Sequence, residues 1–230
     1  MRLMTIMTLL LLTGLPACAG ADRASGGMTR QTMTYDGTER GYYLHVPARV
    51  AASRARVPLV VSLHGGGGNG RIHAMMTGFT AKAEKEGFIV VYPDGSGGLE
   101  TSLLTWNATH CCAYAMRNQT DDVGFIRALL DKLATELPID TSRVYATGLS
   151  NGGMMAHRLG IELSDRIAAI APVLSSLFGD EPPPSAPVPA IIINGGMDTR
   201  IQVEGGEVAV RFSDASDAPT LPVAAQGDFW

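Results

Sequence analysis

The most constraining feature of this sequence is an alternation of strand-length apolar runs with helix-length amphipathic stretches. Six runs are expected to form strands, at residues 42–46, 58–63, 88–92, 144–148, 167–173 and 190–193. Most of them are apolar throughout, which is typical of parallel strands that helices cover on both faces. The alternation therefore predicts an α/β fold with a mostly parallel sheet flanked by helices.

Two helices and one connection stand out between these runs. Apolar residues recur at helical spacing over 123–137, and Thr120 is the expected N-cap. A shorter helix is expected over 77–86, because Gly87 follows it as a helix stop. Residues 181–189 contain five prolines and are expected to form a surface connection.

Composition excludes several classes of protein. Apolar residues make up 46% and charged residues 17% of the chain, so there is enough material for a core and global disorder is excluded. The net charge is −4, with no block of five like charges, which gives no indication of nucleic-acid binding. The 27 glycines and 13 prolines follow no fixed period, so collagen-like and repeat architectures are excluded.

The first residues have the pattern of an export signal. Arg2 precedes an apolar run over residues 4–15, which is too short to span a membrane and suits a secretory signal. We expect a signal peptide at 1–18, a small and polar tether at 19–38, and one domain over 39–230.

The end of this signal has two interpretations. Residues 15–20 resemble the lipobox of bacterial lipoproteins, in which Cys18 would carry a lipid and attach the protein to the membrane of the cell envelope. Residues 17–19 also fit the small-x-small pattern of an ordinary signal peptidase, which would give a free secreted protein. An uncleaved core helix is the third alternative.

Residues 148–152, Gly-Leu-Ser-Asn-Gly, match the pattern G-x-S-x-G. A strand is expected before the motif and a helix over 152–163 after it, which places Ser150 on a sharp turn with its hydroxyl exposed as a nucleophile. Small flanking residues permit such a crowded turn. The alternative is an N-cap serine in a glycine-rich turn.

Residues 64–69, His-Gly-Gly-Gly-Gly-Asn, directly follow the expected strand 58–63. Backbone amides of such a loop can stabilise the oxygen that becomes negative when a serine attacks a carbonyl. The amides of Gly66 and Asn151 are the predicted pair. A phosphate-binding loop is disfavoured, because neither a G-K-[ST] ending nor G-x-G-x-x-G spacing is present. A flexible surface turn remains as the alternative.

Asp198 lies in a loop after the expected strand 190–193. An acid that follows the nucleophilic serine along the chain can orient a catalytic histidine. A single aspartate in a loop is more often a turn former, so a functional role for Asp198 depends on Ser150.

Together these segments resemble the secreted esterase family of polyhydroxybutyrate depolymerases, feruloyl esterases and acetylxylan esterases, which has the α/β-hydrolase fold. The likeness runs from about Arg40 to Gly206. It is carried by residues 44–47, 63–66, 92–95, 106–107, 111–112, 121–125, 148–154 and the Asp198 loop.

The resemblance implies Ser150 as nucleophile, Asp198 as triad acid, and Gly66 and Asn151 in the oxyanion hole. It also implies that Trp106 lies near the substrate groove, although an ordinary buried aromatic is the alternative. No cofactor and no metal ion is implied.

The chain departs from the family pattern in its histidines. The family's catalytic histidine comes late, whereas the last of the five histidines here is His157, about 10 Å from Ser150 by helical rise. His64 is expected to hold the shape of the oxyanion loop, and His110 to lie near the mouth of the site. We expect that the sequence is incomplete at its C-terminus and lacks the last strand, the last helix and the histidine.

The adjacent Cys111 and Cys112 leave three alternatives open: a disulfide partner in the absent tail, a bond to each other, or a zinc site, which their spacing disfavours.

The first functional hypothesis is a secreted or lipid-anchored serine esterase, which hydrolyses carboxylic esters of a polymer or its oligomers through an acyl-enzyme. The second is a non-catalytic envelope or polymer-binding lipoprotein that has the same fold and lacks the base. The third is thiol chemistry at Cys111 or Cys112.

Overall fold

The computed structural model describes residues 28–53, 55–207 and 218–230. The predicted signal peptide at 1–18, with Cys18, lies outside the described residues, and so does the first part of the predicted tether.

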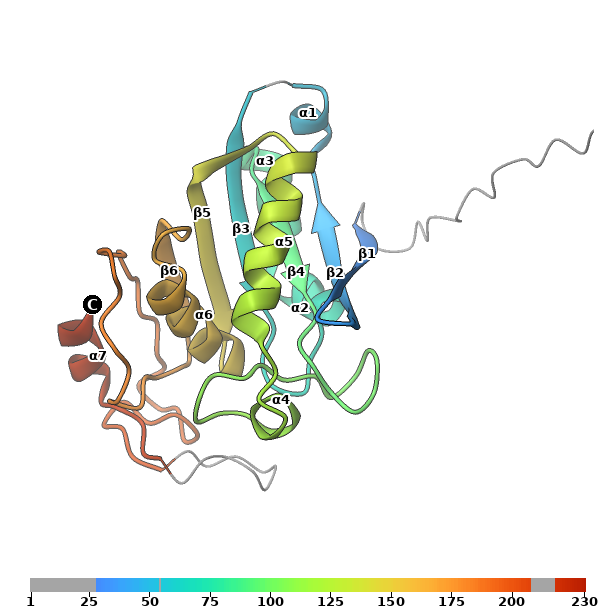
Figure 1. Ribbon diagram of the computed structural model, residues 1–230. Coiled ribbons are helices and arrows are strands. Elements are labelled where there is room, and N and C mark those ends of the chain that lie inside the picture. Colours follow the sequence, from blue (N-terminus) through green and yellow to red (C-terminus); the bar gives the residue numbers. More distant parts are fainter. Residues whose placement is uncertain (1–27, 54, 208–217) are drawn as a thin grey trace, which may run out of the picture.

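A six-stranded sheet forms the centre of the molecule, with the strand order β1-β2-β4-β3-β5-β6 (Figure 1). Its strands are β1 (Thr29–Tyr35), β2 (Thr38–His45), β3 (Val57–Leu63), β4 (Ile89–Pro93), β5 (Ile139–Leu149) and β6 (Ala169–Val173). The pairs β1 with β2 and β2 with β4 are antiparallel, and the remaining three pairs are parallel. The prediction of a mostly parallel sheet is confirmed.

The helices are α1 (Ala48–Ala51), α2 (Gly70–Thr77), α3 (Phe79–Glu86), α4 (Ala113–Arg117), α5 (Asp122–Glu136), α6 (Asn151–Glu162) and α7 (Val223–Phe229). Figure 1 shows α5 and α6 on one face of the sheet and α2 and α3 on the other. In the part of the chain that the structure describes, no helix is both long and apolar enough to cross a membrane.

Two predictions are wrong at the edges of the sheet. Residues 29–38, expected as part of the tether, form β1 and the start of β2, joined by a tight turn at Asp36 and Gly37 with φ of 46° and 72°. Their polar composition suits an edge hairpin, which needs only one apolar face. Residues 190–193, expected as a strand, make only two isolated parallel bridges to β6.

Two helix boundaries also differ from the sequence prediction. The N-cap of α5 is Asp121 instead of Thr120, because the Asp121 carboxylate accepts a hydrogen bond from the Gly124 amide at 2.8 Å. The helix expected over 77–86 is α3, which begins at Phe79 and ends before Gly87 as predicted.

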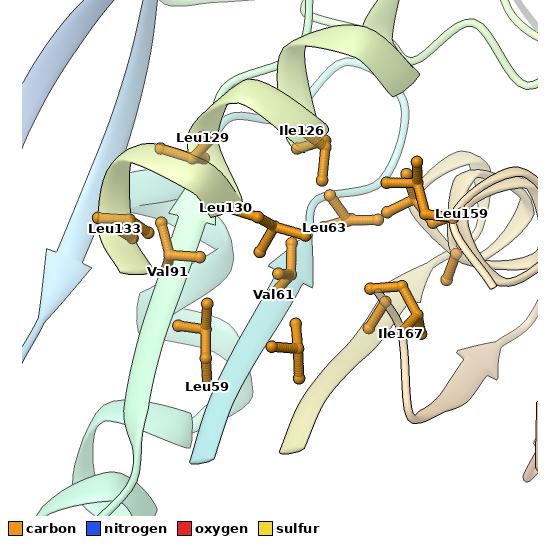
Figure 2. Close-up of a cluster of buried hydrophobic side chains, with 14 of the residues drawn as sticks. Leu59, Val61, Leu63, Val91, Ile126, Leu129, Leu130, Leu133, Leu159 and Ile167 are labelled. Carbon is orange, nitrogen blue, oxygen red and sulfur yellow. The ribbon is translucent and has the colours of Figure 1, made fainter. Parts of the chain in front are cut away.

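Alternate side chains of the central strands divide between two cores. Figure 2 shows Leu59, Val61 and Leu63 of β3 on the side of the sheet that faces α5 and α6. The opposite face of β3 and β4 packs on α2 and α3 through Val60, Val90, Tyr92, Ala74 and Ala83. Both faces of these strands are covered, which explains why their sequences are apolar without alternation.

We predict that Leu129→Ala lowers the free energy of unfolding by about 2–5 kcal/mol, because Leu129 of α5 is fully buried against the sheet. Leu99→Ala is the matched control: Leu99 is 56% exposed, and we expect a change below about 0.5 kcal/mol. Urea unfolding curves measure both values. Equal effects of the two substitutions would contradict the packing described here.

Candidate active site

Ser150 lies on the turn between β5 and α6, as the sequence predicts. Its backbone has φ of 54° and ψ of −122°, a region that residues with a side chain rarely adopt. The Ser150 amide donates to the carbonyl of Val173 in β6, and its carbonyl accepts from Met154 in α6, both at 2.9 Å. Strand pairing and the first helical turn therefore hold the strained residue from both sides.

Two glycines permit this turn. A Cβ atom on Gly148 would collide with the backbone of Gly152, and one on Gly152 would collide with the carbonyl oxygens of Leu63 and His64. The strand end, the turn and the loop after β3 thus approach more closely than side chains would allow.

The glycine loop after β3 lies beside Ser150. A Cβ on Gly65 would lie 3.7 Å from the Cβ of Ser150, and one on Gly66 would lie 3.6 Å from the Cβ of Asn151. The amides of Gly67 and Gly68 donate to Leu104 and Gly65, whereas the Gly66 amide has no acceptor among the described residues. Asn151 is the first residue of α6, where backbone amides have no partner within the helix. The amides of Gly66 and Asn151 are therefore available to a ligand.

His64 holds the shape of this loop. Its Nε2 accepts the Gly95 amide at 2.9 Å, so Nδ1 carries the proton and donates to the Gly65 carbonyl at 2.8 Å. Burial lowers the pKa of His64 to about 4, which keeps the ring neutral at neutral pH. His64 thus has a structural role in the loop, as the sequence predicts.

Trp106 connects the glycine loop to Asn151. The indole is fully buried, and its Nε1 donates to the His64 carbonyl at 3.0 Å. The Asn151 side chain accepts from the Trp106 amide at 2.7 Å and donates to the Trp106 carbonyl at 2.9 Å. In the described structure the indole has no exposed surface, which favours the buried-aromatic alternative for Trp106 over a direct substrate contact.

Sequence reasoning missed a buried ion pair that supports this region. Asp122, which lies in the segment 121–125 that carries the family resemblance, is fully buried, and its Oδ1 lies 2.7 Å from the Arg40 guanidinium. Its second oxygen accepts the Asn107 amide at 2.8 Å, next to Trp106. No spacing rule links Arg40 to Asp122, because the pair joins β2 to α5 across the fold.

Asp198 lies in the loop after residues 190–193. Its Oδ1 accepts the amides of Arg200 and Ile201 at 2.8 and 3.1 Å, the geometry of a local turn. The loop begins where Ile193 accepts the Leu174 amide, next to the end of β6, and β6 is the neighbour of the strand that carries Ser150. The described structure shows no hydrogen bond between Asp198 and any histidine.

The other four histidines are engaged away from Ser150. Their contacts are His45 with Glu84 at 3.0 Å, His73 with Ser62 at 3.0 Å, His110 with Asp180 at 2.7 Å, and His157 with the indole of Trp230 at 2.9 Å. In the described residues, Ser150 therefore has no histidine bonded to it.

The remaining groups of interest are the two cysteines. Cys111 and Cys112 form a disulfide with each other, which is the second of the three alternatives. The sulfur of Cys111 lies 3.7 Å from the side-chain amide nitrogen of Asn151. Within the described ranges, no three His, Cys, Asp or Glu side chains are grouped so that they could hold a metal ion.

We predict that Asn151→Ala lowers the free energy of unfolding by about 1–3 kcal/mol, because the buried Trp106 amide loses its acceptor. The control is Asn118→Ala: its side chain also bonds to a backbone carbonyl but is exposed, and we expect less than about 0.5 kcal/mol. Chemical denaturation of both variants tests the prediction, and a neutral Asn151→Ala would refute it.

The buried histidines predict a pH dependence of stability. Burial lowers the pKa values of His64 and His73 to about 4, whereas an unfolded chain protonates histidine near 6.5. The unfolded state therefore binds more protons as the pH falls from about 6.5 to 4. Each histidine then removes about 1.4 kcal/mol of stability per pH unit.

A variant separates this contribution from that of the carboxylates. We expect His73→Gln, whose side chain can still bond to Ser62, to reduce the slope of stability against pH by about 1.4 kcal/mol per unit between pH 6 and 4.5. Urea unfolding at several pH values measures the slope. An unchanged slope would show that His73 does not stay neutral in the folded state.

Comparison with known proteins places the chain in a family. The model of the family described as Esterase PHB depolymerase matches residues 40–193. The chain is 31% identical over 173 residues to the bifunctional acetylxylan esterase/xylanase XynS20E of Neocallimastix patriciarum, covering 74% of this chain and 23% of that protein. It is 35% identical over 133 residues to feruloyl esterase B of Piromyces equi, covering 55% of this chain and 24% of that protein.

A solved structure shares the fold. The acetyl xylan esterase from Aspergillus awamori superposes with a TM-score of 0.52 at 23% identity, over 64% of this chain and 52% of that one. The chain spans about half the length, or less, of the curated relatives that match most of it. With the match over residues 40–193, the chain belongs to the esterase PHB depolymerase family and has the α/β-hydrolase fold.

Proposed function

We propose that this protein is a serine esterase that hydrolyses carboxylic esters of a polymer or its oligomers through an acyl-enzyme. The observation that carries the proposal is the backbone of Ser150, which is strained at the junction of β5 and α6 beside the glycine loop. Strain of this kind is maintained where a nucleophile must stand clear of the sheet.

In the proposed mechanism, the Ser150 Oγ attacks the ester carbonyl, and the carbonyl oxygen becomes negative. The amides of Gly66 and Asn151 donate to this oxygen. Collapse of the intermediate releases the alcohol and leaves the acyl group on Ser150. Water then attacks the acyl carbonyl, the bond from the acyl carbon to the serine oxygen breaks, and the carboxylic acid leaves as the Ser150 hydroxyl is reprotonated.

A base must take the serine proton and return it to the leaving alcohol. The family resemblance implies a histidine oriented by Asp198 in this role, and the second carboxylate oxygen of Asp198 is not used by its local turn. None of the five histidines of the sequence occupies this position in the described structure. Free imidazole can therefore stand in for the base in an experiment.

The family and its relatives support a polymeric substrate. The description of the family names PHB depolymerases, and the two relatives reported above are named as an acetylxylan esterase/xylanase and a feruloyl esterase. We further propose that the protein is exported, on the basis of the apolar run at residues 4–15, with a lipid on Cys18 as the anchored form.

A second candidate is a non-catalytic polymer-binding protein with the same fold. The engagement of all five histidines away from Ser150 favours it. A serine without a base is a poor nucleophile at neutral pH, so this chain would then bind polymer without hydrolysing it.

Acylation of Ser150 distinguishes the two candidates. We expect imidazole to raise the rate of Ser150 acylation by a short activated ester about tenfold, because it supplies the general base. Intact-mass spectrometry during the reaction measures the acyl-protein, and peptide mapping locates it.

Ser150→Ala is the control, since it keeps the fold and removes the nucleophile. It should form no acyl-protein at any imidazole concentration. Equal labelling of the two proteins, or no labelling of the wild-type chain, would reject the esterase and favour the binding protein.

A further inference from the structure

The outer side of α2 carries three exposed apolar side chains, which together are called the α2 patch. Ile72, Met75 and Met76 are 51%, 74% and 68% exposed. Spacings of three and four residues place them on one side of the helix. His73 and Ala74 lie on the other side, where they are buried against β3 and β4. A group of apolar side chains that water reaches, unlike a single one, indicates an interaction surface.

The loop between β4 and α4 adds to this exposed apolar surface. Leu99 and Leu103 of the loop are 56% and 59% exposed. The loop is bonded to the start of α2, because the side-chain amide of Asn69, the N-cap, donates to the Thr101 carbonyl at 2.7 Å. The loop and the first turn of α2 are therefore neighbours, and the loop supplies further apolar side chains at this end of the helix.

The charged groups of α2 and α3 favour an anionic partner. α2 contains no acidic residue, and Arg71 is exposed next to the α2 patch. Arg71 and Lys85 of α3 form no ion pair with another described residue, whereas Glu84 and Glu86 each lie beside a partner. Basic side chains of this kind can bind the headgroups of a lipid layer while their apolar stems lie against its interior.

The described part of the chain begins beside the same two helices. Met28 is buried in a cluster with Ala74 of α2 and Ala83 of α3. The Thr80 hydroxyl of α3 also donates to the sulfur of Met28 at 3.6 Å. The segment that precedes Met28 in the sequence therefore joins the domain on the side that carries α2 and α3.

The length of that segment limits where a membrane can lie. Met28 follows Cys18 by ten residues, which span at most about 36 Å when fully extended. A domain of this size is about 40 Å across. In the anchored form proposed above, on which this inference rests, a lipid on Cys18 holds that residue at the membrane. The segment is too short to pass around the domain, so the side with α2 and α3 stays next to the bilayer.

We propose that the α2 patch docks on the lipid bilayer in the anchored protein, with Ile72, Met75 and Met76 at the boundary between headgroups and acyl chains. In this orientation the face with α5 and α6 points away from the membrane (Figure 1). The surface of an apolar polyester could also contact such a patch, but the segment from Cys18 holds only the bilayer beside it. The lipid surface is therefore the favoured occupant.

Tryptophan quenching by brominated phospholipids tests the contact. The full chain is produced with its own signal in a bacterial host, purified from the membrane fraction and reconstituted into vesicles that contain anionic phospholipids with bromine on their acyl chains. We expect the fluorescence that Met75→Trp adds to the parent protein to fall by about half relative to unbrominated vesicles, because the side chain reaches the acyl chains. Thr135→Trp is the matched control: Thr135 is exposed on α5, and its added fluorescence should not change.

Intact-mass spectrometry of the same protein separates docking from anchoring. A lipid on Cys18 with equal quenching at the two positions would overturn docking and leave the anchored form standing. Absence of the lipid would reject the anchored form and this proposal with it. Neither measurement depends on the chemistry of Ser150, so a failed esterase is distinguishable from both outcomes.

Adsorption to a polyhydroxybutyrate film tests the alternative occupant. We expect the double variant Met75→Ser and Met76→Ser to adsorb to the film as its parent does. Weaker adsorption of the double variant, together with no quenching of Met75→Trp in brominated vesicles, would assign the α2 patch to the polymer and overturn the proposal.

Discussion

The backbone of Ser150 holds a conformation that costs roughly 1–3 kcal/mol for a residue with a side chain, and the surrounding segments are arranged to maintain it. On one side the Ser150 amide is tied to β6, and on the other its carbonyl begins α6. This requires β5, the loop after β3 and the first turn of α6 to meet with no side chain between them. Gly148 and Gly152 satisfy that requirement, so the central sheet and the proposed nucleophile depend on the same close approach.

A continuous set of buried polar contacts extends outward from that turn. Asn151 holds the backbone of Trp106, the Trp106 indole holds the His64 carbonyl, and the neutral His64 ring joins the glycine loop to Gly95. Each group satisfies a neighbour that would otherwise be buried without a partner, which makes the loop a fixed part of the structure. Within this fixed loop the amides of Gly67 and Gly68 are already bonded, whereas the Gly66 amide has no acceptor among the described residues.

Sequence reasoning succeeded where local pattern determines structure. The apolar runs of β3, β4 and β5 and the G-x-S-x-G turn were predictable, because hydrophobic period and glycine sterics act over a few residues. The edge strand β1 was not predictable, because a strand with one polar face has an amino-acid composition similar to that of a loop. The pair of Arg40 with Asp122 and the burial of Trp106 were not predictable either, because they arise from contacts between segments far apart in the chain.

The two halves of the proposed catalytic pair have different structural support. Ser150 is fixed by the interior of the sheet, whereas the Asp198 carboxylate is oriented by amides of its own loop. That loop follows Ile191 and Ile193, which are 67% and 49% exposed and reach β6 only through backbone bonds. The nucleophile and the proposed oxyanion amides are therefore assembled independently of the acid.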